Sequence, residues 1–191
     1  FFHDFADTIR RELLPDIASF IDDQSKAMED RHAEYGESLF LLQPNLKEGA
    51  GGLRDYHTAY WVARGGQPSV RDLDDFLHFG LLTENEMTDY HAALEFLWRV
   101  RNDLHLLTKR RCDQMSFELQ EQIAATLGYD GLNEGAGELP VERFMRDYYR
   151  HARAIQNFSE LVIEQSAARA TRGGRTRRVR EVEAGLRLAE G

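Results

Sequence analysis

The feature that most constrains the fold of this chain is the spacing of its apolar residues, which recur every three or four positions in almost every segment. The clearest case lies between residues 84 and 111. Its apolar stripe consists of Met87, Tyr90, Leu94, Leu97, Trp98, Leu104 and Leu107. This is the period of an α-helix that buries one face. No stretch of useful length alternates as a half-buried strand does, so the sequence predicts an all-α fold, a bundle of five to seven helices with a glycine-rich loop.

Capping signals divide the chain into separate helices. Thr83 with Glu86 has the pattern of a capping box and predicts the start of the helix that covers residues 84–111. Pro140 suits the first turn of a last helix, which we expect to run to about Gln165. The other predicted helices cover residues 1–35, kinked or split at Pro15, residues 53–64, ended by Gly65 and Gly66, a short segment capped by Ser69 with Asp72, and residues 117–127.

Charge and composition exclude several classes of function. Residues 1–165 hold 17 basic residues against 30 acidic ones, so we expect this helical domain not to bind nucleic acid. The longest apolar runs are too short to cross a membrane. The single cysteine, Cys112, allows no internal disulfide, which fits a cytoplasmic protein. Residues 166–180 hold six arginines and no acid, and we expect residues 166–191 to form a basic flexible linker toward a further domain.

The segment PNLKEGAGGLRD, residues 44–55, is the strongest candidate for a binding site. Gly51 and Gly52 allow close approach of the backbone and stand just before a helix, whose N-terminus presents free N–H groups. Lys47 and Arg54 add positive charge, and Asp55 either complements the helix dipole or orients Arg54. These residues together suit a phosphate or a carboxylate. The alternative is a pair of helix caps whose glycines serve only the backbone geometry.

Two further sets of cations are candidates for the same ligand. Arg143, Arg146 and Arg150 share one face of the last helix, either as a solvated surface or as a cationic wall toward an anion or another domain. Arg101 and His105 lie four residues apart on the long helix, where the histidine is either a packing residue or a supporting group.

The sequence predicts no metal site. It contains no H-E-x-x-H motif and no cysteine cluster. Asp72, Asp74 and Asp75 imitate the D-x-D of nucleotidyltransferases, but in a helix Asp72 and Asp74 point about 200° apart and cannot share an ion. We interpret all three as surface acids.

Four segments in order carry a resemblance to a known family. They are PNLKEGAGGLRDYHTAYWVAR, FLHFGLLTENE, LWRVRNDLHLLTKRRCDQMSFELQEQIAATLGY and PVERFMRDYYRHAR, within about residues 25–165. Together they resemble the helical domain of the bacterial PII uridylyltransferases, the bifunctional uridylyltransferase/uridylyl-removing enzymes of nitrogen control. Gln43 stands where this family is expected to have Glu. The shorter core K-x-G-x-G-G-L-R-D is also similar to the helical region of glutamine synthetase adenylyltransferase.

This resemblance implies a chain that is one part of a larger enzyme. The family combines a nucleotidyltransferase domain, this helical domain, an HD phosphohydrolase domain and two ACT domains. It uses UTP and Mg²⁺ to transfer UMP to a tyrosine of the PII signalling protein. The glycine-rich strand motif with its D-x-D and the HD metal ligands are absent from this sequence, so the resemblance implies no catalytic residue and no metal ligand here, and an isolated chain that is inactive.

The sequence hypothesis is therefore that the loop closes over the nucleotide of the adjacent catalytic domain. Lys47 and Arg54 would neutralise the triphosphate, the amides of Gly51 and Gly52 would assist, and Arg143, Arg146 and Arg150 would line the same cleft. One alternative is a scaffold that spaces the catalytic domains and docks PII. A second is a HEPN-type ribonuclease, because Arg99 and His105 have the spacing of its R-x(4–6)-H motif.

Overall fold

The computed structural model describes residues 16–36, 38–67, 69–72, 74–131, 137–176, 179–182 and 186–189, and it describes only the backbone of residue 131 and of residues after 171. Within these residues the helices are α2 (Ile17–Tyr35), α3 (Leu53–Gly66), α4 (Asp74–His78), α5 (Glu84–Thr108), α6 (Phe117–Thr126), the 3-10 helix η1 (Tyr129–Gly131) and α7 (Pro140–Thr176). Two short strands follow, β1 (Val179–Val182) and β2 (Leu186–Ala189). The predicted all-α bundle of five to seven helices is confirmed.

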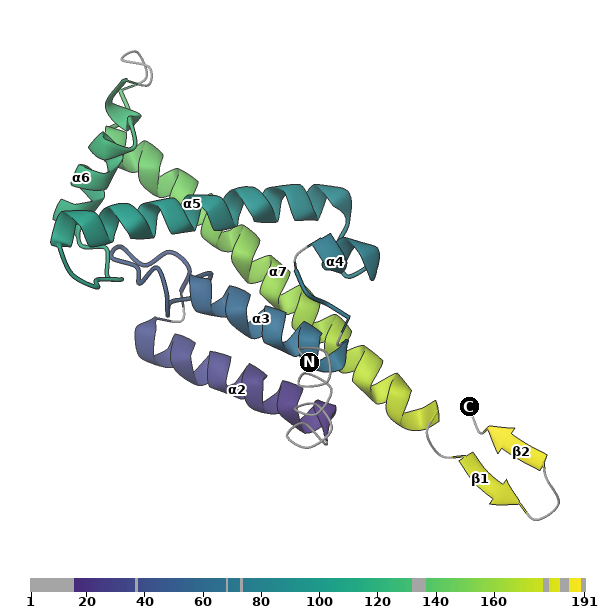
Figure 1. Cartoon of the computed structure of the whole chain (residues 1–191). Helices are drawn as coiled ribbons and strands as arrows, with labels where there is room; N and C mark the ends of the chain where they lie inside the picture. The colour runs from purple at the N-terminus through teal and green to yellow at the C-terminus, as the bar shows by residue number, and fades with distance from the viewer. Residues whose placement is uncertain are drawn as a thin grey trace.

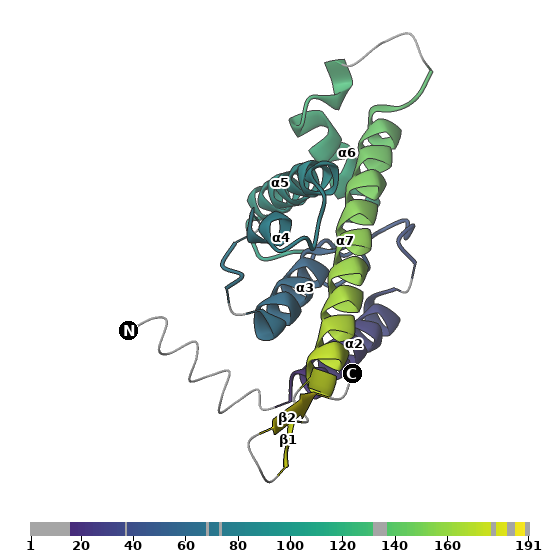
Figure 2. The same ribbon diagram turned by 90° about the vertical axis from the view of Figure 1, so that its right-hand side faces the viewer.

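Helix α7 is the axis of the bundle. It runs diagonally through the molecule, with α3 and α5 packed along it (Figure 1). Helices α6 and α2 also contact α7, α6 near its N-terminal end, and α2 lies beside α3 (Figure 2). Apolar side chains of α7 are buried in this core: Phe144, Tyr148, Ala152, Ile155, Phe158 and Val162. The core is therefore built around a single long helix rather than around a symmetric four-helix arrangement.

The long helix α5 starts as its sequence predicts. Thr83 accepts a hydrogen bond from the Glu86 amide at 3.4 Å, and the Glu86 carboxylate accepts one from the Thr83 amide at 2.8 Å, so the capping box is formed. Met87, Tyr90 and Leu97 of the predicted stripe are buried. Trp98 and Leu107 are partly exposed, which leaves part of this stripe available to solvent.

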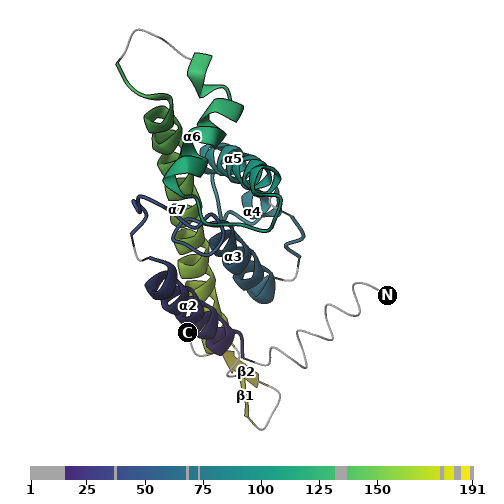
Figure 3. The same cartoon turned by 90° about the vertical axis from the view of Figure 1, so that its left-hand side faces the viewer.

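Helix α2 begins at Ile17, directly after its cap Asp16, whose side chain accepts hydrogen bonds from the Ala18 and Ser19 amides at 3.0 and 3.3 Å. The helix expected between Phe1 and Pro15 lies outside the described residues. The loop that joins α2 to α3 crosses α7 below the end of α5 (Figure 3). Leu46, Ala50, Gly51 and Gly52 of this loop are buried, so the glycine-rich segment is packed into the fold.

Three local predictions are corrected by the structure. The cap before α4 is formed by Asp72 with Asp75 instead of Ser69 with Asp72: the Asp75 amide donates to Asp72 at 3.2 Å and the Asp72 amide donates to Asp75 at 3.4 Å. Helix α7 continues to Thr176, beyond the end expected near Gln165. The antiparallel hairpin, which pairs Val179 with Ala189 and Val182 with Leu186, lies where no strand was predicted. The role of residues 166–191 as a linker stays a prediction.

Candidate functional site

The glycine-rich loop is held against the core by its backbone. The Leu46 amide donates to the Asp113 carbonyl at 2.8 Å, and the Met115 amide donates to the Pro44 carbonyl at 3.0 Å. The Asn45 side chain accepts hydrogen bonds from the amides of Lys47 and Glu48, two and three residues later, at 3.0 and 2.8 Å. The loop is thus a fixed part of the fold, anchored to the segment that connects α5 to α6.

Gly51 explains why the loop needs glycine. Its φ of +70° lies in the left-handed region, and a Cβ atom at this position would collide with the carbonyl oxygen of Ala152 in α7. Gly52 is also enclosed, because a Cβ atom there would lie 2.8 Å from the carbonyl oxygens of Lys47 and Gly49. The glycines let the loop pack against the backbone of α7 and against itself.

The amides at the start of α3 are already hydrogen-bonded within the protein. The Gly51 amide donates to the Asp55 carboxylate at 2.8 Å, and the Gly52 amide donates to the Gly49 carbonyl at 2.9 Å. The next two amides, of Leu53 and Arg54, donate to loop carbonyls at 3.0 and 2.9 Å. A helix N-terminus binds an anion through free N–H groups, so in this conformation the amides of Gly51 and Gly52 are not free to do so.

Asp55 lies on the inner side of the loop. Its side chain is 1% exposed and contacts Arg31, while His32 Nε2 lies 2.9 and 3.1 Å from its two carboxylate oxygens. Arg31 also donates to the Glu48 carbonyl at 3.2 Å. We call Arg31, His32, Asp55 and the Gly51 amide the inner network. It ties α2 to the loop, so Asp55 pairs with α2 and not with Arg54.

Lys47 and Arg54 lie together on the outer side of the loop, on either side of Glu48. Lys47 Nζ is 2.5 Å and Arg54 Nη2 is 3.4 Å from Glu48 Oε1. About a third of each cationic side chain is exposed. Burial alone would raise the pKa of Glu48, but its hydrogen bonds and charge interactions with Lys47 and Arg54 lower it. Glu48 therefore stays ionised and orients both cations toward solvent.

His57 joins this outer side to α5. Its half-buried position lowers its pKa, and the positive charges of Arg54, Arg101 and Lys47 lower it further, against a smaller opposite effect of Glu48. The charges of three cations, from the loop, α3 and α5, therefore act on one half-buried imidazole. We call Lys47, Arg54 and Arg101 around His57 the cation cluster.

Arg101 and His105 share a face of α5, as predicted, and both contact Asp113. Arg101 Nε lies 2.7 Å and His105 Nε2 lies 3.2 Å from Asp113 Oδ1. Burial would raise the pKa of Asp113, but Arg101 and then His105 lower it through hydrogen bonds and charge. Because the Asp113 carbonyl also accepts the Leu46 amide, these contacts fix Arg101 relative to the loop.

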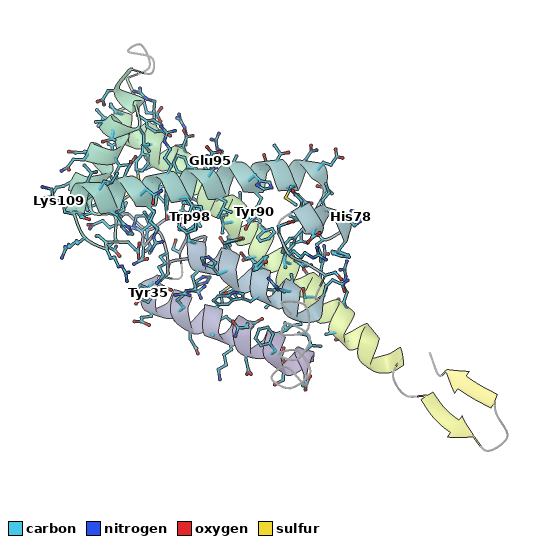
Figure 4. The ribbon with its side chains drawn as sticks, viewed as in Figure 1. Tyr35, His78, Tyr90, Glu95, Trp98 and Lys109 are labelled. Carbon is cyan, nitrogen blue, oxygen red and sulfur yellow. The ribbon has the colours of Figure 1, made fainter. Side chains whose placement is uncertain are left out.

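Two tryptophans border the cation cluster. Trp61, 45% exposed, follows His57 by one turn of α3, and the two rings stack with centroids 6.0 Å apart. Trp98, 37% exposed, precedes Arg101 by one turn of α5, and the guanidinium carbon lies 5.7 Å from the centroid of its ring. Figure 4 shows Trp98 on the side of α5 that faces α3, with Glu95 on the opposite side.

The arginines of α7 lie elsewhere. Arg143 donates to the carbonyls of Glu138 and Tyr129 at 3.1 and 2.5 Å, which secures the start of α7 to η1. Arg146 pairs with Glu138 at 2.7 Å and Arg150 with Asp147 at 3.4 Å. Among the contacts of the described residues, none joins these arginines to Lys47 or Arg54. The structure thus brings the loop and α5 candidates together and does not bring the α7 candidates to them.

Arg146 and Arg150 instead border a groove between α6 and α7, of about 910 Å³. We call it the α6–α7 groove. Its lining residues are Phe40, Leu42, Phe117, Gln120, Glu121, Val141, Glu142, Met145, Arg146, Tyr149, Arg150 and Arg153. Phe40, Leu42 and Phe117 are each more than half exposed. The guanidinium carbon of Arg153 lies 5.1 Å from the ring centroid of Phe40.

The sequence analysis missed Glu48, His57 and Trp61 as members of the site. A signal for two of them was present, because Arg54, His57 and Trp61 follow one another by three and four residues and so share a face of α3. Trp98, Arg101 and His105 repeat this spacing on α5. The pairing of Glu48 with both cations depends on the loop conformation and has no such signal.

Neither a metal cluster nor a membrane span is found among the residues that the structure describes. No three or more of their His, Cys, Asp and Glu side chains form a group that could hold a metal ion. No helix among them is both long and apolar enough to cross a membrane.

The family model and the similar proteins agree on one family. Residues 19–163 match the model of the family described as GlnD PII-uridylyltransferase. The chain is similar to proteins named bifunctional uridylyltransferase/uridylyl-removing enzyme from Cereibacter sphaeroides, at 40% identity over 80% of this chain, and from Azotobacter vinelandii, at 39% over 82%. The protein of that name from Ruegeria pomeroyi is 33% identical over 96% of this chain.

The alignments cover 16%, 17% and 20% of those three relatives, so this chain spans at most about a fifth of their length. No solved structure gives a significant match. The family model covers most of the chain, and its match agrees with the motifs and with the helical fold. This chain belongs to the GlnD PII-uridylyltransferase family.

Proposed function

We propose that this chain is the helical domain of a longer cytoplasmic uridylyltransferase, in which it binds the phosphates of the nucleotide and positions the catalytic domain. The relatives are named as uridylyltransferases and the family description names PII, so we propose UTP as the nucleotide and a PII signalling protein as the UMP acceptor. One observation carries the proposal: Glu48 fixes Lys47 and Arg54, and Asp113, whose carbonyl binds the loop, fixes Arg101, on a chain whose net charge is −9. Such a local positive site on an acidic protein selects anions at that point.

The side chains, rather than the loop amides, are the groups that we assign to phosphate. The amides of Gly51 and Gly52 donate within the loop, whereas Lys47 and Arg54 are a third exposed and held in place by Glu48. Arg101 is held by Asp113 in the same way. Cations fixed before the ligand arrives stabilise negative charge without reorganisation, which is the arrangement that phosphoryl-transfer sites use.

Magnesium is implied by the family resemblance, but the described residues do not fit a magnesium site, because no cluster of three or more possible ligands is present among them. No step in this proposal passes through the metal. We propose that the metal ligands and catalytic carboxylates lie in the nucleotidyltransferase domain of the parent, that an HD domain also accompanies this chain, and that this chain alone does not transfer UMP.

Equilibrium dialysis of UTP and of inorganic triphosphate against the 191-residue chain tests the phosphate site. Arg54→Ala removes one charge-assisted contact and should weaken binding of both ligands by about tenfold or more. Arg99→Ala is the matched control, because Arg99 lies two residues from Arg101 but its charge affects the pKa of Tyr129 and not that of His57. Equal affinities for the two variants would contradict the proposal. In the full-length parent, Arg54→Ala should reduce uridylylation and leave UMP removal largely intact.

The α6–α7 groove favours a second function, a docking surface for a part of the parent polypeptide outside this chain. The relatives are about five or more times as long as the aligned segment, and Phe40, Leu42 and Phe117 are exposed around one groove. Hydrogen exchange tests this: the backbone amides around the groove should exchange more slowly in the parent than in the 191-residue chain. Equal exchange in both would exclude such docking. Nucleotide affinity should not respond to Leu42→Ser in the 191-residue chain.

A further inference from the structure

The two tryptophans of the chain both border the cation cluster, and the proposed phosphate site does not use either of them. Trp61 stacks on His57, and Trp98 lies beneath Arg101. An exposed indole beside a phosphate site has a chemical use, since nucleic-acid bases stack on aromatic side chains regardless of base identity.

Arg54, His57 and Trp61 form one continuous stripe on α3. Seven residues separate Arg54 from Trp61, which corresponds to about 10 Å along the helix. This separation is comparable to that between the phosphate chain and the base of one nucleotide. A cation therefore lies at one end of the stripe and an exposed flat ring at the other.

His57 suits the position between them as an uncharged ring. Burial and the three neighbouring cations keep its pKa below the ordinary value, so the imidazole is neutral at neutral pH. The ring planes of His57 and Trp61 differ by 24°, so the imidazole lies nearly parallel to the indole and supports it from one side. Trp98 is less suited, because the Arg101 guanidinium already occupies a cation–π position on its ring and Trp98 is less exposed than Trp61.

We propose that Trp61 is the base-stacking platform of a nucleoside triphosphate whose phosphates bind Lys47, Arg54 and Arg101. This inference rests on the proposed function of the cation cluster. A stacking platform recognises the presence of a base and its ring area rather than its hydrogen-bonding edge. The isolated chain should therefore bind ATP at least as tightly as UTP, so that any choice of uracil is made by groups outside this site.

The experiment compares ligands with and without a base on variants of the 191-residue chain. Equilibrium dialysis should show that Trp61→Leu weakens ATP binding about tenfold and leaves inorganic triphosphate binding unchanged. Trp98→Leu is the matched control and should retain ATP affinity within about threefold. In a Trp98→Phe background, the single remaining tryptophan emission should be quenched by ATP and UTP but not by inorganic triphosphate. Circular dichroism verifies that each variant is folded.

The outcomes separate this inference from the function on which it rests. If the Trp61→Leu variant binds ATP as tightly as the unmodified 191-residue chain while Arg54→Ala weakens ATP binding, the platform is excluded and the phosphate site stands. If ATP, UTP and inorganic triphosphate all fail to bind, the cation cluster has no nucleotide role and both proposals fall. Tighter binding of a single-stranded oligonucleotide than of any mononucleotide would also overturn the platform as a mononucleotide site. The same holds if Trp98→Leu, and not Trp61→Leu, weakens ATP binding.

Discussion

Arg54 and Asp55 are neighbours in the sequence but belong to two different regions of the molecule. Asp55 points into the inner network, where Arg31 and His32 of α2 and the Gly51 amide surround its buried carboxylate. Arg54 points to the outer side, where it is a third exposed beside Lys47 and Glu48. One region maintains the fold, and the other is the one that we propose for ligand binding. The pair teaches that two adjacent polar residues of one motif can point to opposite sides of a loop, one into the fold and one toward its surface.

The largest expected effect comes from breaking the inner network. Asp55→Ala leaves Arg31 as a partly buried charge without its carboxylate and the Gly51 amide without an acceptor. Removing one partner of a buried ion pair typically lowers the free energy of unfolding by about 3–5 kcal/mol. Urea denaturation measures this change. Asp23→Ala, at an exposed position of α2, should stay within about 0.5 kcal/mol, and a similar loss for both variants would show that the inner network is not special.

A second effect tests why the loop contains glycine. Gly51→Ala forces an alanine into the left-handed region and places its Cβ against the carbonyl oxygen of Ala152. The expected loss in the free energy of unfolding is about 2–4 kcal/mol. Gly66→Ala is the control, because nothing lies within 4 Å of a Cβ atom there. Equal free energies of unfolding for Gly51→Ala and Gly66→Ala would contradict the close packing of the loop on α7.

The outer side is expected to respond in binding rather than in stability. Glu48→Gln removes the carboxylate that neutralises part of the charge of Lys47 and Arg54. Affinity for inorganic triphosphate should rise about threefold, since single exposed charge interactions contribute about 0.2–1 kcal/mol. Glu34→Gln, at an exposed position of α2, controls for the change in net charge alone. Weaker binding by Glu48→Gln would mean that Glu48 orients the cations more than it neutralises them.

The smallest effect concerns pH. Arg54 on α3, Arg101 on α5 and Lys47 on the loop face His57, and with burial they lower its pKa in spite of Glu48. The unfolded chain therefore takes up this proton first, and stability should decline as the pH falls below the ordinary histidine pKa of about 6.5. His57→Gln should reduce the decline measured by urea denaturation between pH 7.5 and pH 5.5. The remaining decline includes His151, whose pKa is also lowered by burial and then by Arg150. An unchanged slope would show that His57 is not perturbed.

The sequence predicted the fold better than the division of the loop into two sides. The apolar stripes, Pro140 and the Thr83–Glu86 box act over a few residues, so they can be read without tertiary contacts. The Asp55 side chain points inward because it pairs with Arg31, 24 residues earlier. Gly51 is needed because the loop packs against α7, about 100 residues later. Neither is visible in a local pattern.

Helix α7 was also underestimated, and for a physical reason. Gly173 and Gly174 each disfavour a helix by about 1 kcal/mol relative to Ala, which argues for an end before them. The structure nevertheless continues the helix through both glycines to Thr176. A propensity read from composition is therefore a poor guide to where this helix ends.

The continuity of α7 gives the molecule a mechanical property. Ser166 is its last buried residue before the described side chains end, and the ten residues from Ala167 to Thr176 add about 15 Å of rod beyond it. A rod of this kind transmits torsion: each residue inserted after Ser166 would turn the end of α7 at Thr176 by about 100° around the helix axis, whereas seven inserted residues would restore its orientation almost completely. The direction in which the chain leaves α7 is thus periodic in the length of this helix.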